Sequence, residues 1–91
     1  MRLILYSKPG CHLCEGLQEK LEQIQNLSFE LEVRDITTRE DWFAAYEYEV
    51  PVLYLSNRRG AEDTEEKLLP RPSPRASVQQ LEQMLRKYLV N

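Results

Sequence analysis

Apolar residues recur along the chain with two different periods, and the first blocks predict a strand followed by a helix. The unbroken apolar run from Leu3 to Tyr6 is typical of a strand covered on both faces, so we expect a central strand over residues 2–7. Lys8-Pro9-Gly10 ends it. From about His12 to Gln25 the spacing becomes helical, which predicts an amphipathic helix. Its apolar face carries Leu13, Leu17, Leu21 and Ile24.

Gly16 lies inside this predicted helix. A glycine in a helix interior costs roughly 1 kcal/mol relative to alanine. The cost indicates either that another part of the chain packs closely against this position or that the first turn is kept adaptable. Both interpretations stay open on the sequence.

The middle of the chain predicts a second strand and a short second helix. Apolar residues from Phe29 to Val33 alternate with charged ones, which is typical of an edge strand with one buried face. Thr37 or Thr38, followed three residues later by Glu40 or Asp41, matches a capping box that opens a short helix. We expect the aromatic residues of this helix to be core: Trp42, Phe43 and Tyr46.

The last third predicts two more strands. Val50 to Leu55 is mostly apolar, and Pro51 is tolerated at the start of a strand because its missing N–H falls outside the ladder. Ser56 to Gly60 has the composition of a turn. Glu66 to Leu69 matches a short edge strand that Pro70 ends.

A final amphipathic helix follows. Ser77 and Gln80 form a predicted capping box, and a start at Ser73 with Pro74 in the first turn is the alternative. Residues at helical spacing give this helix an apolar face: Val78, Leu81, Met84, Leu85, Tyr88 and Leu89.

The order of these elements predicts an α/β fold with a four-stranded mixed sheet and helices on both faces. Right-handed crossovers would place the first and third strands side by side and parallel. The second strand would then lie at one edge and the fourth, antiparallel, at the other. At 91 residues, we expect a single domain over residues 1–91.

Composition narrows the function classes. Twelve Lys and Arg against fifteen Asp and Glu give a formal net charge of -3, which argues against a nucleic-acid binder. No apolar run approaches the roughly 18 residues of a membrane helix, and the first residues lack the pattern of a secretory signal. We therefore expect a cytoplasmic monomer that binds neither nucleic acid nor membrane.

Two cysteines, Cys11 and Cys14, lie where the first strand turns into the first helix. Unpaired N–H groups and the positive end of the helix dipole favour a thiolate at a helix N-terminus, so Cys11 is the candidate nucleophile. Cys14 lies about one turn further on, where it can resolve a mixed disulfide. The alternatives are a metal carrier for copper, zinc or an iron–sulfur cluster, in which His12 is a further typical donor, and an interaction module without turnover.

Two residues near the cysteines are candidates for tuning them. Lys8 precedes Cys11 by one tight turn, so its ammonium is placed to stabilise the thiolate or to meet a substrate carboxylate. His12 has either a direct acid/base role or the role of an exposed spacer that tunes the redox potential. Tyr6, on the central strand, either borders the site or fills the core.

The run Tyr6-Ser7-Lys8-Pro9-Gly10-Cys11-His12-Leu13-Cys14, together with Val50-Pro51-Val52-Leu53, resembles glutaredoxin-like proteins of the thioredoxin fold, in particular small ones with a Cys-His-Leu-Cys site. The resemblance extends over essentially the whole chain. It implies a β-α-β-α-β-β-α order, thiol-disulfide oxidoreductase activity, a redox-active Cys11–Cys14 disulfide and no bound cofactor or metal. It also implies a cis Pro51 beside the cysteines. The backbone of Val50 is then placed to pair with an extended substrate.

One region departs from that family. Glutaredoxins hold the γ-glutamyl end of glutathione with a Gly-Gly-x-Asp stretch, and the corresponding region here runs from Leu69 to Ser77 without it. Arg71, Arg75 and Ser77 are the candidates to replace those contacts, and Arg39 is a candidate for a carboxylate of a peptide or of glutathione. The expected substrates are protein or small-molecule disulfides. The expected electron donor is glutathione or a thioredoxin-type reductase.

Overall fold

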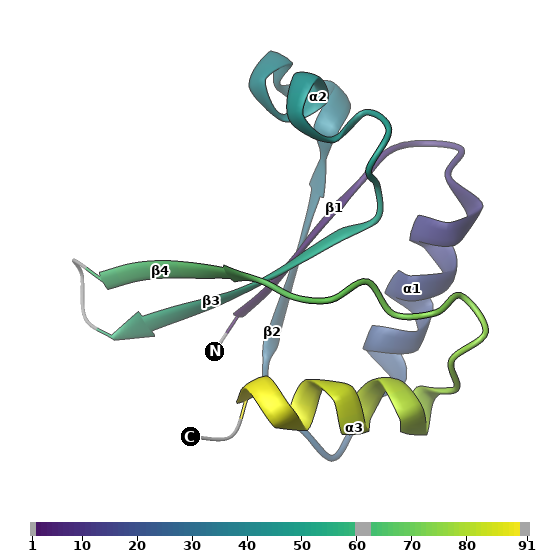
Figure 1. Ribbon diagram of the computed structural model, residues 1–91, viewed down its shortest axis with the longest axis vertical. Helices are drawn as coiled ribbons and strands as arrows, with labels where there is room; N and C mark the ends of the chain where they lie inside the picture. Colours follow the sequence, from purple (N-terminus) through teal and green to yellow (C-terminus); the bar gives the residue numbers. More distant parts are fainter. Residues whose placement is uncertain (1, 60–62, 90–91) are drawn as a thin grey trace.

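A computed structural model describes the backbone of residues 2–59 and 63–89 and the side chains of residues 2–56 and 66–88 (Figure 1). Gly60 and the side chain of Leu89, which took part in the sequence predictions, lie outside these ranges. The elements are β1 (Arg2–Ser7), α1 (His12–Gln23), β2 (Glu30–Asp35), the 3-10 turn η1 (Ile36–Thr38), α2 (Glu40–Tyr46), β3 (Val52–Arg59), β4 (Asp63–Leu68) and α3 (Val78–Leu89). Their order is the predicted one.

The four strands form one mixed sheet in the order β2-β1-β3-β4. β1 is central, as its apolar run predicts, and pairs in parallel with β2, with Leu5 opposite Val33. β3 pairs with β1 in the antiparallel direction, with Leu5 opposite Leu53. β4 is antiparallel to β3. The predicted parallel pairing of the first and third strands is therefore wrong.

The short length of α2 agrees with the antiparallel direction of β3. A helix of seven residues advances only about 10 Å, whereas a six-residue strand is about 20 Å long. A parallel β3 would have to start at the opposite end of the sheet, and α2 alone would cover only about half of that distance. The chain instead re-enters the sheet near the end where β2 leaves it, as Figure 1 shows, and β3 runs back.

The hairpin of β3 and β4 is longer than the sequence suggests. β3 continues to Arg59 and β4 begins at Asp63, so the predicted turn from Ser56 is wrong and the fourth strand is not confined to Glu66–Leu69. Ser56 pairs with Glu66 in this ladder. Polar residues are tolerated here because an antiparallel hairpin can leave one face in water.

The two predicted capping boxes have different outcomes. Thr37 and Thr38 lie in η1, which the carboxylate of Asp35 caps by accepting a hydrogen bond from the Thr37 N–H at 2.9 Å. Hydrogen bonds from the hydroxyl and the N–H of Thr37 lower the pKa of Asp35. α2 begins after Arg39 without a side-chain cap, so its predicted box is wrong.

The capping box of α3 is confirmed. The N–H of Ser77 donates to the Gln80 side chain at 2.9 Å, and the N–H of Gln80 donates to the Ser77 hydroxyl at 3.1 Å. Two orphan donors at the start of the helix are satisfied in this way. The alternative start at Ser73 is not used.

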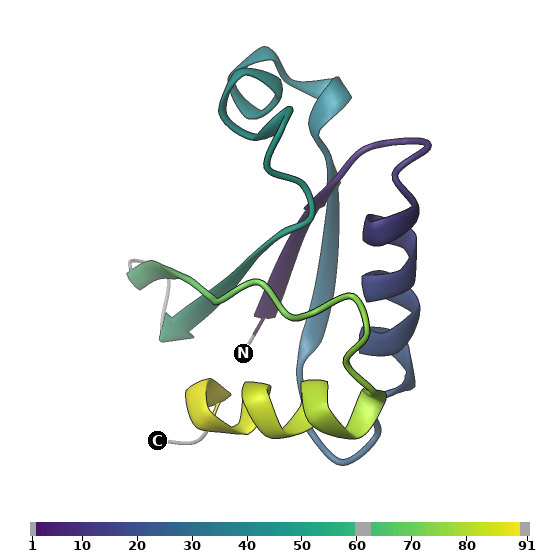
Figure 2. The same cartoon turned by 45° about the vertical axis from the view of Figure 1, so that its right-hand side comes forward.

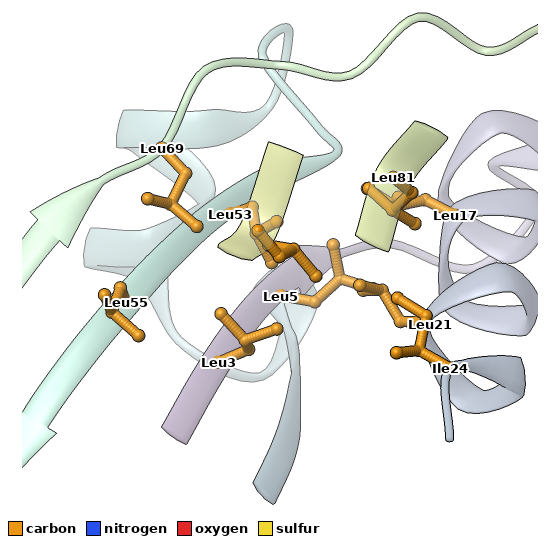
Figure 3. Packing of buried hydrophobic residues seen from close by; sticks show 10 residues of the cluster. Leu3, Leu5, Leu17, Leu21, Ile24, Leu53, Leu55, Leu69 and Leu81 are labelled. Atoms are coloured by element: carbon orange, nitrogen blue, oxygen red, sulfur yellow. The ribbon is translucent and has the colours of Figure 1, made fainter. Parts of the chain in front are cut away.

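α1 and α3 cover one face of the sheet (Figure 2). Leu21 from α1 and Leu81 and Leu85 from α3 pack with Leu3 and Leu53 into the larger core cluster (Figure 3). Both helices are 12 residues long and amphipathic. Among the described residues, no helix combines the length and the apolar character needed to span a bilayer.

α2 lies at one end of the other face. Trp42 and Tyr46 are four residues apart and pack together against Tyr6. Phe43 points about 100° away around the helix and is 37% exposed, so its predicted core position is wrong. Leu13 in α1 is also exposed, because Cys14 takes the inward position at that turn.

The larger core cluster, under α1 and α3, predicts how substitutions in α3 change stability. Leu85→Ala removes a fully buried side chain from α3 and should lower the free energy of unfolding by about 2–5 kcal/mol, through lost burial and a residual cavity. Leu68→Ala is the matched control, because Leu68 is 59% exposed on β4 and should change stability by about 0.5 kcal/mol or less. Urea unfolding of both variants measures the difference. Equal losses would contradict the assignment of the core.

Candidate functional site

The start of α1 places one sulfur at the helix N-terminus. Gly10 takes a φ of +79°, which lets the chain turn between β1 and α1 without steric cost. Cys11 follows as the N-cap residue with extended backbone angles, and its Sγ accepts a hydrogen bond from the N–H of Cys14 at 3.2 Å. The sulfur of Cys11 therefore acts as the N-cap acceptor, a role that a serine or aspartate oxygen has at most helix starts.

Cys11 and Cys14 form a disulfide, with 5.3 Å between their Cα atoms. Cys14 is only 2% exposed, whereas Cys11 is half-buried, so the sulfur of Cys11 is the one that an incoming group can reach. In the part of the chain that the structure describes, no three side chains of His, Cys, Asp or Glu gather in a way that could hold a metal ion.

The Val50–Pro51 peptide bond is cis, and Val50 shares a buried cluster with Cys14. Both main-chain groups of Val50 have partners within the chain. Its N–H donates to the carbonyl of Tyr46 at 3.1 Å, and its carbonyl accepts from Nη2 of Arg71 at 2.7 Å. Pro51 has no N–H to offer.

The two candidate tuning residues lie differently. The ammonium of Lys8 donates to the carbonyl of Glu47, the residue that ends α2, at 3.2 Å. This contact ties the turn before Cys11 to the negative end of α2. The His12 side chain is almost fully exposed, with its Nδ1 3.8 Å from a carboxylate oxygen of Glu15.

Tyr6 is a core residue, and it belongs to the same buried cluster as Cys14 and Val50. It is buried, its ring packs against Trp42, Tyr46 and Tyr54, and its hydroxyl accepts from Arg34 at 2.8 Å. The Tyr46 hydroxyl donates to the Tyr54 hydroxyl at 3.2 Å. Desolvation is the main cause, and this hydrogen bond the second, of a pKa of Tyr46 raised above its ordinary value.

A small groove lies between α1 and the segment 71–76 that leads into α3. Its volume is about 120 Å³, and Lys20 spans one side of it by donating to the carbonyl of Pro74 at 2.9 Å. Leu13 is exposed on its rim. A methyl group added at Gly16 would meet no atom within 4 Å, so close packing does not explain this glycine. The remaining lining is mostly apolar: Leu17, Pro51, Pro72, Ala76 and Leu81.

The four residues predicted to contact an anion are not brought together. Arg71 lies next to Pro51, as its bond to Val50 requires. Arg75 is exposed at the rim of a separate hollow, and Ser77 caps α3. Arg39 pairs with Asp41 at 2.9 Å and lies over the ring of Trp42. Arg39 also lowers the pKa of Asp41, mainly through the hydrogen bond to its carboxylate.

Sequence reasoning missed Leu13, Gly16 and Lys20 as residues of the groove. Leu13 is exposed because its neighbour Cys14 points inward at this turn of the helix. No local signal marked Lys20, since its contact with Pro74 joins residues 54 positions apart.

Comparison with known proteins agrees with this architecture. The family model described as Glutaredoxin-like domain (DUF836) matches residues 2–86. The X-ray structure of the structural-genomics target protein XcR50 from X. campestris, which has a thioredoxin-like fold, is 26% identical, with a TM-score of 0.58. The alignment covers 93% of this chain and 96% of that one. No curated protein matches the chain significantly.

The two glycines near the cysteines predict opposite effects of the same substitution. Gly16→Ala should raise the free energy of unfolding by up to about 1 kcal/mol, because helix propensity improves and the space is free. Gly10→Ala should lower it by about 1–2 kcal/mol, because alanine is strained at this positive φ. Thermal unfolding of the two variants tests both signs. A Gly16→Ala protein with a lower free energy of unfolding would contradict the open space found next to Gly16.

Proposed function

The chain belongs to the glutaredoxin-like domain family, and on this premise we propose that it is a thiol-disulfide oxidoreductase with Cys11 as nucleophile and Cys14 as resolving thiol. The observation that carries the proposal is the Cys11–Cys14 disulfide at the start of α1, with one reachable and one buried sulfur. Its position at a helix N-terminus, in contact with the buried cluster that contains Val50, supports the same interpretation.

The proposed reaction is an exchange of two electrons. In the reduced protein, the Cys11 thiolate attacks one sulfur of a substrate disulfide, forms a mixed disulfide and releases the other half as a thiolate, which takes a proton from water. The Cys14 thiol then loses its proton and attacks Sγ of Cys11, which re-forms the internal disulfide and releases the second half as a thiolate that takes up a proton. The substrate is reduced to two thiols and the protein is oxidised.

The start of α1 stabilises the charge that this reaction needs. The N–H of Cys14 donates to the Cys11 sulfur, and such a bond is stronger to a thiolate than to a neutral sulfur. The helix dipole adds about 0.3–1 kcal/mol in the same direction. Lys8 uses one of its three N–H donors on Glu47, which holds the ammonium near the turn and leaves two donors for the thiolate or a substrate carboxylate.

The oxidised protein requires two electrons and two protons to return to the dithiol form. We assign them to glutathione or to a thioredoxin-type reductase, and we place the reaction in the cytoplasm, where thiols are kept reduced. No resident cofactor enters this cycle. A disulfide-reduction assay coupled to glutathione and its reductase, run beside one coupled to a thioredoxin reductase, distinguishes the two donors.

The different roles of the cysteines give a direct test. Cys11→Ser should abolish reduction of a neutral small disulfide, because the attacking sulfur is gone. Cys14→Ser should keep the first step and accumulate a mixed disulfide at Cys11, which intact-protein mass spectrometry detects. Circular dichroism checks that both variants are folded. A folded Cys11→Ser protein with wild-type turnover would refute the proposal.

Alkylation kinetics test the part played by Lys8. Lys8→Ala should slow alkylation of reduced Cys11 by iodoacetamide at pH 7 by about threefold to tenfold, because less of the sulfur is thiolate. At pH 10, where the thiol ionises without help, the two rates should agree within about twofold. Lys87→Ala, on exposed α3 surface, is the charge-matched control. Equal rates at pH 7 for all three proteins would remove Lys8 from the mechanism.

A further inference from the structure

The main chain beside the cis bond is already hydrogen-bonded within the protein. The N–H of Val50 is bound to Tyr46, and the carbonyl of Val50 is bound to Arg71. Adding an extended peptide as a new strand requires free N–H and C=O groups on the receiving chain. A substrate paired with Val50 would have to break the bond to Tyr46 and share the carbonyl with Arg71. Side chains therefore have to supply most of the recognition here.

Arg71 is the side chain best placed to do so. Its guanidinium has five N–H donors in a planar fork, and the bond to Val50 uses one of them. The residue is exposed and lines both the groove over Gly16 and a larger hollow of about 520 Å³ beside β3 and α2. The bond to Val50 fixes the charge next to Pro51, which lowers the entropic cost of binding an anion. The remaining fork matches a carboxylate.

The charges around the groove agree with an anionic ligand. Four of the described basic side chains outside the groove have carboxylate partners: Arg2, Arg34, Arg39 and Arg86. Lys20 and Arg71, which line the groove, donate instead to main-chain carbonyls, and a carbonyl does not neutralise a cation. The lining of the groove contains no Asp or Glu among the described residues, whereas the larger hollow includes Glu49. A ligand carboxylate is therefore favoured on the groove side of Arg71.

We propose that this protein selects disulfides that carry a carboxylate close to the reacting sulfur, and that Arg71 is the specificity-determining residue that binds it. The group next to the reacting cysteine lies in the apolar groove over Gly16, and no strand is added at Val50. This inference rests on the proposed thiol-disulfide exchange. An acidic residue of a protein substrate and a carboxylate of glutathione supply the same chemistry, and the test separates them.

The test compares disulfide substrates that differ in one property. Three of the substrates are peptides in disulfide form. The first has Glu next to the cysteine, the second has Gln at that position, and the third has Glu with the flanking backbone amides methylated. Glutathione disulfide is the fourth substrate. Wild-type protein should show kcat/KM about tenfold higher for the Glu peptide than for the Gln peptide. Backbone methylation should change it less than twofold. Raising the salt concentration from 50 to 500 mM should shrink the Glu/Gln ratio, because a charge contact is screened.

Variants assign the preference to Arg71. Arg71→Gln should bring the Glu/Gln ratio below about two, and Arg71→Lys, which keeps the charge but not the fork, should give an intermediate ratio. Arg86→Gln removes a charge from α3 and should leave the wild-type ratio unchanged. If Arg71→Gln lowers kcat/KM for the Glu peptide, the ligand is a carboxylate of a protein substrate. If it lowers kcat/KM for glutathione disulfide, the ligand is a carboxylate of glutathione.

The outcomes separate this inference from the proposed function. A wild-type ratio near one, a ratio unaltered by Arg71→Gln, or a tenfold loss on backbone methylation would overturn the role of Arg71 while exchange activity remained. The wild-type measurements need no variant, so a poorly folded Arg71→Gln protein would not prevent the decision. Failure of folded wild-type protein to reduce any of the four disulfides would refute the exchange reaction itself.

Discussion

The antiparallel register of β1 against β3 is the constraint on which the site depends. Because Tyr6 lies opposite Val52, the last residues of β1 and the first residues of β3 meet at the same end of the sheet. The turn with Cys11 leaves that end, and the cis bond before Pro51 enters it. In a parallel pairing the two would be separated by the length of a strand, about 20 Å. The chain enters β3 at the end of the sheet where β1 finishes, and this placement brings the cysteines and the proline together.

The sequence predicted features that depend on near neighbours and missed those that depend on distant ones. The apolar run of β1 and the capping box at Ser77 are local patterns, and the structure contains both. Thr37 matched a capping box equally well in the sequence. In the structure its N–H donates to the carboxylate of Asp35, which caps η1, and Thr37 does not cap α2. The direction of β3 and the partner of Arg71 depend on how the chain crosses the sheet. No short motif encodes that path.

The segment between β4 and α3 is held by side chains because its own backbone offers few hydrogen bonds. Pro70, Pro72 and Pro74 lack N–H groups, so the segment has few main-chain donors; the N–H of Ala76 donates to the carbonyl of Ser73 at 3.0 Å and closes a single turn. Lys20 fastens it to α1 through the carbonyl of Pro74, and Arg71 fastens it to the loop before β3. Proline also restricts the backbone in the unfolded chain, which reduces the entropy lost when the segment is ordered. The segment therefore forms one side of the groove, and the charged groups of Lys20 and Arg71 lie at this groove without an acidic partner in its described lining.

The proposed recognition by charge has a kinetic consequence, because the proposed exchange reaction requires release of the reduced substrate. Main-chain pairing with a substrate adds several directional hydrogen bonds. Because most differences in affinity between related complexes appear in the rate of dissociation, such bonds slow the release of the substrate. A partly exposed guanidinium attracts an anion over a longer range and mainly raises the rate of encounter. Since Val50 has its main-chain bonds inside the chain, contact with a substrate can be formed and broken without disturbing β3 or α2. If the protein carries out the proposed exchange reaction, this arrangement favours rapid exchange of many acidic disulfides over tight binding of one extended peptide.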